Sequence, residues 1–327
     1  MAVKGLTALT LVDWGKRVDP NGKIDKVIEL LSQTNDILTD MLFVEGNLPT
    51  GHRTTVRSGL PTATWRKLNY GVQPSKSTTV QVTDATGMLE AYAEVDKSLA
   101  DLNGNTSEFR LSEDRAFLES MNQNMAQTLF YGDTTINPER FMGLSSRYSS
   151  KSAGNGQNII DAGGAGTDNT SIWLIVWGEN TCHGIFPKGQ KAGLQHQDLG
   201  EQTLTDDAGG KYQGYRSHYK WDNGLTLRDW RYVVRIANID VSDLSTGSAA
   251  NIVTQMVKAL HRVPSLKMGR AAFYMNRTVA QALDLQSLDK SSLALSVKAT
   301  EGEWWTTFRN IPIRETDAIL ETEARVV

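Results

Sequence analysis

The stretch SEFRLSEDRAFLESMNQNMAQTLFYG, residues 107–132, has the longest helical pattern in the chain. Its apolar side chains recur at three-, four- and seven-residue spacing: Leu111, Leu118, Met121, Met125 and Leu129. That spacing is typical of one buried helix face. We therefore predict a helix over residues 107–131 that Gly132 ends. At 1.5 Å per residue this helix is roughly 35 Å long, whereas about three turns is average.

The preceding segment, residues 46–83, has strand patterns instead. Glycine and proline occur seven times in it and divide it into short runs. Residues 52–57 and 63–68 have the composition of strands, and residues 78–83 (TTVQVT) alternate like a third strand. Together these pieces predict a long β-hairpin.

The sign of the charge reverses at the end of this hairpin. Residues 46–83 contain no acidic residue and five cations: Arg53, Arg57, Arg66, Lys67 and Lys76. Residues 84–119 are predominantly acidic, and six of their acids are candidate contacts: Glu90, Glu94, Glu108, Glu113, Asp114 and Glu119. Two interpretations explain this reversal equally well. The two segments are separately solvated faces, or the basic segment is an arm that lies on an acidic surface of its own chain or of a neighbour.

The rest of the chain mixes helical and strand patterns, so the expected fold class is α+β. The expected elements are a helix at 23–44, a Ser- and Gly-rich surface loop at 145–169, a buried strand at 171–177 (SIWLIVW), a loop-rich region at 178–224, one long strand or a strand pair at 225–239, a helix at 248–263, a strand at 271–275 and a helix at 277–288.

Composition excludes several classes of protein. The 327 residues include 34 Lys and Arg against 37 Asp and Glu, a net charge of -3, which argues against a non-specific nucleic-acid binder. The single cysteine, Cys182, rules out an internal disulfide. No stretch approaches the ~18 apolar residues of a membrane helix, and the N-terminus makes a poor signal peptide. We expect a soluble intracellular chain of one to three domains.

Motifs for catalysis or cofactor binding are absent from the sequence. There is no dinucleotide-binding or phosphate-binding glycine motif, and no two of the five histidines are spaced as zinc ligands. Cys182 and His183 are adjacent, but a lone Cys-His dipeptide lacks the spacing of a metal site, and a buried thiol beside an ordinary imidazole is the favoured interpretation. We therefore expect no enzyme activity, no cofactor and no metal.

Aromatic residues suggest two alternative functions. Aromatic and cationic side chains alternate over residues 212–221 and 230–232, which fits stacking of single-stranded nucleic acid or a strand with one core face and one solvent face. The eight tryptophans and nine tyrosines, with many of them in glycine-rich regions, also fit a carbohydrate-binding or carbohydrate-acting α+β protein.

Several phrases of the sequence resemble one family. They are LFYGDT (129–134), NPERFMGL (137–144), IFPKG (185–189), DLG (198–200) and WDNGLTLRDWRYVVRIANID (221–240). With the order of the elements, these phrases resemble the major capsid proteins of tailed double-stranded DNA bacteriophages, which have the Hong Kong 97-like fold, and short-tailed phages most of all. The resemblance extends from about Leu48 onward, and the segment before it fits by position alone.

The resemblance implies a division of the chain. Its parts are an N-terminal arm (1–45), an extended β-hairpin loop (46–83), a peripheral domain (84–170) with a spine helix at 107–131, and an axial domain with the remaining peripheral strands (171–327). The basic loop of one subunit is then expected to rest on the acidic spine region of a neighbour.

The resemblance also implies a structural function. The chain is expected to assemble with itself into hexamers and pentamers of an icosahedral shell that encloses double-stranded DNA without sequence-specific binding. Expected partners are a portal, a decoration protein and a scaffolding protein, the last as a separate chain because the arm begins almost at once. The expected location is the virion, after assembly in the bacterial cytoplasm and without a membrane.

Overall fold

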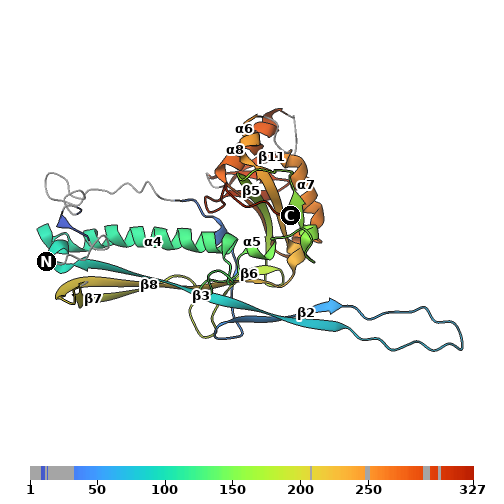
Figure 1. Ribbon diagram of the computed structural model, residues 1–327, viewed down its shortest axis with the longest axis horizontal. Helices are drawn as coiled ribbons and strands as arrows, with labels where there is room; N and C mark the ends of the chain where they lie inside the picture. Colours follow the sequence, from blue (N-terminus) through green and yellow to red (C-terminus); the bar gives the residue numbers. More distant parts are fainter. Residues whose placement is uncertain are drawn as a thin grey trace.

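A long helix and a thirteen-stranded sheet dominate the described chain (Figure 1). The computed structural model describes residues 9–11, 13, 33–206, 208–246, 251–289, 295–300 and 303–327. Its α-helices among these residues are α2 (Ile37–Asp40), α3 (Lys97–Ala100), α4 (Thr106–Tyr131), α5 (Leu144–Arg147), α6 (Val241–Thr246), α7 (Ile252–Arg262) and α8 (Arg277–Asp289). The strands are β1 (Phe43–Glu45), β2 (Gly51–Gly59), β3 (Thr78–Asp96), β4 (Ile159–Asp161), β5 (Asn169–Trp177), β6 (Cys182–Phe186), β7 (Gln195–Thr205), β8 (Lys211–Leu227), β9 (Val233–Asp240), β10 (Arg270–Met275), β11 (Leu295–Thr300), β12 (Glu303–Phe308) and β13 (Ile311–Glu315).

Helix α4 confirms the predicted long helix. Up to Met121 the helix lies over β3 and β8, where Met121 packs with Ala93 and Tyr219, while Leu111 on the same predicted stripe is 52% exposed. Its last turns enter the main core through Leu129 and other buried side chains. The helix is therefore anchored at its C-terminal end and only half covered along the rest of its length.

We define the platform as α4 with β3, β7 and β8. Its strand β3 pairs with two different strands along its length. β2 pairs antiparallel with the first part of β3, from Gly59↔Thr78 to Gly51↔Ala85. From Thr86 onward, β3 pairs antiparallel with β8 instead, and β8 pairs with β7. Figure 1 shows the result: β2 and the start of β3 project beyond the platform as a hairpin.

The structure corrects two details of the predicted hairpin. Residues 63–68 form no strand, because all of residues 60–77, which the structure describes in full, make a loop with a single turn. The strand predicted at 78–83 continues to Asp96, so the expected boundary between residues 83 and 84 falls inside β3. The acidic side chains of residues 84–96 interrupted the alternation that marked the strand.

The body, which we define as the compact part built on β4, β5, β9 and β10 with α6–α8, has β5 at its centre. All nine β5 residues are buried. Ile172, Leu174 and Val176 contact the core under α7 and α8, whereas Trp173 and Ile175 point to the other side, toward the end of α4. A strand buried on both faces reads as a continuous apolar run, which is why the sequence predicted it.

The remaining predicted helices and strands are confirmed in part. The helices at 248–263 and 277–288 and the strand at 271–275 are confirmed as α7, α8 and β10, with residues 248–250 outside the described residues. The region 178–224 is not loop-rich, since it contains β6, β7 and most of β8. Of the helix expected at 23–44, residues 23–32 lie outside the described residues, and the described part is the single turn α2 followed by β1.

Candidate interaction surface

The hairpin tip, residues 60–77, exposes large apolar side chains. Trp65 is fully exposed, and Leu68 and Tyr70 are 86% and 71% exposed. Within the tip, the backbone N–H of Tyr70 donates to the Lys67 carbonyl, and the Ser75 hydroxyl donates to the Thr62 carbonyl at 2.9 Å. Exposed apolar groups gathered on one projecting segment mark an interaction site in soluble proteins.

The five predicted cations all lie on this hairpin. Arg53 and Arg57 are on β2, opposite Thr83 and Thr79 of β3, and the Arg53 Nε donates to the Thr83 hydroxyl at 3.3 Å. Three cations lie on the exposed tip: Arg66, Lys67 and Lys76. The hairpin is therefore a basic and partly apolar arm that points away from α4 (Figure 1).

The six predicted acids lie on the platform, and most of them contact groups of their own chain. Glu90 and Glu94 are on β3, where Glu94 accepts from Arg216 at 2.5 Å and Glu90 lies 3.7 Å from the Lys220 ammonium. Glu119, on α4, accepts from the Gln33 backbone N–H at 2.9 Å. The structure thus divides the acids between two faces of the platform: Glu90 and Glu94 lie on the sheet face away from α4, and the other four lie on α4 itself.

Asp114 and Glu108 lie on the same helix but differ in their exposure to solvent. Asp114 is half-buried beside Ser217 and Tyr219, and this burial raises the pKa of its carboxyl despite hydrogen bonds that favour the charged form. Glu108 and Glu113 lie nearer the start of α4, and Glu108 is exposed to solvent. Of the four acids on α4, Glu108 is the exposed one.

The alternating aromatic and cationic residues of β8 have a structural explanation. Tyr219 is buried under α4, whereas Lys220, His218 and Arg216 meet carboxylates of β3 on the opposite face of the sheet. On that face the Tyr92 ring of β3 stacks on the His218 ring with centroids 4.5 Å apart. The pattern therefore reflects one core face and one ion-paired face, and the base-stacking interpretation loses its support.

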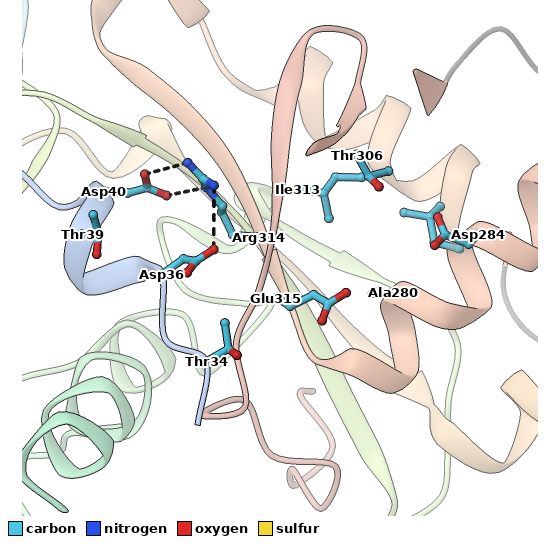
Figure 2. Close-up of a pocket in the computed structure, with 11 residues that line it drawn as sticks. Thr34, Asp36, Thr39, Asp40, Ala280, Asp284, Thr306, Ile313, Arg314 and Glu315 are labelled. Atoms are coloured by element: carbon cyan, nitrogen blue, oxygen red, sulfur yellow. Dashed lines mark hydrogen bonds and ion pairs between the residues drawn. The ribbon is translucent and has the colours of Figure 1, made fainter. Parts of the chain in front are cut away.

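A second feature is an acidic cavity of about 530 Å³ between α2, α8 and β13 (Figure 2). Arg314 of β13 lines it and points toward α2 (Figure 2), with its Nε 3.1 Å from Asp40 Oδ2 and its Nη1 3.8 Å from Asp36. Asp284 and Glu315 also line the cavity, so carboxylates outnumber the one guanidinium. The Arg314 pairs fix α2 against the sheet, which gives this cluster a structural role.

Cys182 is a buried residue of the core. Burial raises the pKa of its thiol to about 12, so the thiol is protonated at neutral pH and is not a nucleophile. His183 is not the ordinary imidazole that we expected, because burial lowers its pKa to about 4. Among the described residues, no three His, Cys, Asp or Glu side chains are placed to hold a metal ion.

Two buried charged clusters have no signal in the sequence. Arg235 of β9 pairs with Glu323 at 2.8 Å, and both side chains are only 3% exposed. Asp84 pairs with Arg147 at 2.9 Å near the base of the hairpin. The partners lie 63 to 88 residues apart, so only the folded topology brings them together.

Within the described part of the chain, no helix is long and apolar enough to cross a membrane.

Four of the largest aromatic side chains belong to the core. Trp173, Trp177, Tyr148 and Tyr274 are among the largest fully buried side chains, and the Trp177 indole N–H donates to the Tyr274 hydroxyl at 2.7 Å. A carbohydrate site needs exposed aromatic faces, and these four rings have none to offer. Packing explains these four rings, whereas Trp65 and Tyr70 lie exposed on the hairpin tip.

Comparisons with known proteins agree on one family. A family model described as major capsid protein GP7 matches residues 19–327. A chain from the structure of Bacteriophage Epsilon15 is 36% identical with a TM-score of 0.74, and the match covers 100% of this chain and 99% of that one. A search of curated proteins found no match.

More distant similarities were also found. A chain of the Bacteriophage JBD30 capsid is 9% identical with a TM-score of 0.46, over 88% of this chain and 92% of that one. A chain of the encapsulin complex from Synechococcus elongatus PCC 7942 is also 9% identical with a TM-score of 0.46, over 71% and 96%. At these scores neither similarity supports an argument about this chain.

The family match spans nearly the whole chain, and the Epsilon15 match spans all of it. The mixed helix and sheet architecture, with its projecting hairpin and long helix, is the Hong Kong 97-like capsid fold that the sequence resemblance implied. The chain belongs to the family of major capsid protein GP7, the major capsid proteins of tailed bacteriophages.

Proposed function

We propose that this chain assembles with itself into hexamers and pentamers that close an icosahedral shell around double-stranded DNA. The projecting hairpin supports this best, because its exposed Trp65, Leu68 and Tyr70 are covered by no part of their own chain that the structure describes. Obligate interfaces bury on the order of 2,000–5,000 Å², and an arm supplies such area without enlarging the core. A net charge of -3 suits a wall that encloses DNA without binding it tightly.

The same proposal assigns roles to the parts of the chain. Residues 1–45 are the N-terminal arm, and residues 46–83 are the extended loop that lies across an adjacent subunit. Residues 84–170, with α4 as the spine helix, are the peripheral domain, and residues 171–327 supply the axial domain together with the remaining peripheral strands, β7 and β8. A separate scaffolding protein, a portal and a decoration protein are the proposed partners, with assembly in the bacterial cytoplasm.

We propose no catalytic role for any residue. The Cys182 thiol is the one nucleophile of its kind in the sequence, and its raised pKa keeps it protonated. The adjacent His183 is fully buried, so substrate cannot reach it. The chain's contribution to the virion is therefore its shape and its contacts.

Assembly is tested by producing the chain together with the phage's scaffolding protein. Electron microscopy of the purified material is expected to show closed shells of uniform size. A chain that stays strictly monomeric under these conditions, with its hairpin folded against its own body, contradicts the proposal.

A charge reversal tests the proposed seat of the loop on a neighbour's acidic platform. Changing Arg66 and Lys67 together to Glu is expected to lower shell yield, and more strongly at low salt, where charges are less screened. One exposed ion pair contributes only about 0–1 kcal/mol, but every subunit repeats it. Shell yield is measured by sedimentation at two salt concentrations.

Rescue distinguishes this contact from general damage. Because Glu108 is the accessible acid on α4, Glu108→Lys is expected to restore part of the yield in the reversed variant. The matched control reverses Lys258 and Arg262 instead, two exposed cations on α7 of the body. Full yield from the Arg66 and Lys67 variant at low salt, or equal loss from the control, contradicts the proposed contact.

A further inference from the structure

The root of the hairpin is the point where β3 exchanges one partner strand for another. Asp84 is the next-to-last β3 residue paired with β2, opposite His52, and Thr86 is the first one paired with β8. The chains are tightly packed here: a Cβ on Gly51 would lie 2.0 Å from the Asp84 carbonyl oxygen. The junction therefore leaves no room for a side chain at Gly51.

Two histidines from different strands meet at this root. His52 is the second residue of β2, and His183 is the second residue of β6, opposite Thr226 of β8. Their ring centroids are 6.1 Å apart in an edge-on arrangement. They are 7% and 0% exposed, so β2 and β6 meet through two imidazoles that are shielded from water.

The charge of a neighbouring arginine disfavours a proton on either histidine. An Nη2 of Arg228, just beyond β8, donates to the His52 Nε2 at 3.1 Å, which requires that nitrogen to be unprotonated. The Arg228 Nε and the His52 Nδ1 have no hydrogen-bond partner among the described residues. A proton on Nε2 of His52 would break the bond to Arg228 and set two cations against each other.

The remaining charged groups do not compensate for a further proton. Asp84 faces His52 across the strands, but it is already paired with Arg147 of α5 at 2.9 Å. Cys182 lies beside His183 in sequence, and its buried thiol is uncharged at neutral pH. With both histidines neutral, the two arginines and Asp84 already give the cluster one net positive charge.

Neither ring nitrogen of His183 has a well-aligned hydrogen-bond partner among the described residues. The Gly178 backbone is the one group that raises the His183 pKa, and its effect is smaller than those of burial, Arg228 and His52. Unpaired buried polar atoms are uncommon in folded proteins, and each one weakens the packing that holds it.

We propose that His52 and His183 form an acid-sensitive joint that holds the root of the extended hairpin closed while both imidazoles are neutral and opens it when they take up protons. The bond from Arg228 to His52 and the edge-on contact of the rings belong to the closed state. In the open state β2 separates from β6 and from Arg228, and the hairpin pivots about β3. This proposal concerns the single chain and does not rest on shell assembly.

The direction of the pH dependence follows from burial. Burial first, and then the positive charge of Arg228, lower the pKa of both histidines, that of His183 from 6.5 to about 4. In the open state the rings regain ordinary values, so the open state binds more protons between those two pH values. The closed root is therefore fully favoured above about pH 6.5 and loses that preference as the pH falls toward about 4.

A spin label on β2 measures the opening directly. Thr55 is exposed on β2, and because the natural Cys182 is buried, a Thr55→Cys variant of the full chain takes the label at one position. We expect its mobile fraction to rise at least about fivefold between pH 7.5 and pH 4.5. A label that stays equally immobile over this range overturns the proposal.

Three variants separate the joint from general acid unfolding. His183→Leu removes the titrating group and both unpaired nitrogens, so its opening midpoint is expected at least about one pH unit lower than that of the wild type. His52→Gln is expected to shift the midpoint in the same direction, and His261→Gln, at an exposed site on α7, is expected to leave it unchanged. Equal midpoints in all variants overturn the proposal.

A measurement on the unaltered chain covers the case in which a variant fails to fold. With five histidines in the sequence, carbon-13 NMR resolves their titrations individually. The His183 resonance is expected to stay in its neutral position until the root opens, whereas His261 titrates normally. Protonation of His183 near pH 6.5 with the label still immobile contradicts the joint.

Discussion

Replacing Glu323 by alanine is expected to lower the free energy of unfolding by about 3–5 kcal/mol. The Glu323 Oε2 lies 2.8 Å from Arg235 Nη2, and both side chains are almost fully shielded from water. Removing the carboxylate leaves the arginine charge buried without a partner, which is the costly case for an ion pair. Denaturant unfolding of the unassembled full chain measures the change.

Two hydroxyl groups make the loss larger than that of the pair alone. The Tyr131 hydroxyl donates to Glu323 Oε1 at 2.5 Å, and the Ser171 hydroxyl donates to Oε2. Burial and the neighbouring carboxylate raise the pKa of Tyr131 far above its ordinary value, so this hydroxyl keeps its proton and remains a donor. Alanine at position 323 leaves both donors without their acceptor.

A double variant is the matched control for this prediction. Arg235→Met with Glu323→Leu removes both charges and keeps apolar volume, so it is expected to lose much less stability than Glu323→Ala. A loss below about 1 kcal/mol in the single variant, or an equal loss in both, contradicts the role given to the pair.

The position of Glu323 explains why so much depends on it. Its backbone N–H donates to the Asn169 carbonyl of β5 at 2.8 Å, and three residues later the Val326 N–H donates to Asn238. Tyr131, the last residue of α4, reaches the same carboxylate. The final described segment therefore ties the end of the long helix to the central strands of the body.

The sequence predicted elements whose pattern is local. The helix over 107–131 and the strand over 171–177 each bury a stripe or a continuous run that is visible within one window, and both are confirmed as α4 and β5. β7 was missed because it buries only Leu204 and has polar side chains on both faces. A two-sided polar strand has no alternation to detect.

The candidate surface also has a part that the sequence predicted and a part that it did not. The basic, acid-free arm over residues 46–83 was visible as composition, and the structure places its cations on the hairpin as expected. The root cluster was not visible, because His52, His183 and Arg228 are separated by 131 and 45 residues and carry no motif. Their contact depends on the order of β6, β8, β3 and β2 in the sheet, which the sequence did not reveal.

Gly132 is the second position where we expect a large loss of stability on substitution. It ends α4 and lies in close contact with the backbone around it. Its φ is -55°, so the helix does not end in a left-handed glycine turn. A Cβ there would lie 2.3 Å from the Phe141 carbonyl oxygen and 2.6 Å from that of Thr128. The Gly143 N–H also donates to the Gly132 carbonyl at 2.8 Å, which holds the returning chain against the helix end.

Gly132→Ala is therefore expected to destabilise the unassembled chain by about 1–3 kcal/mol, because the atoms that an added methyl group meets are backbone atoms with little freedom to move. Gly154→Ala is the matched control, since a Cβ at Gly154 has open space within 4 Å and is expected to change stability by less than about 0.5 kcal/mol. Unfolding in denaturant compares the two variants. Equal stability would mean that the turn relaxes freely; the expected difference would show that the phrase from Tyr131 to Leu144 is fixed by close packing at the end of α4.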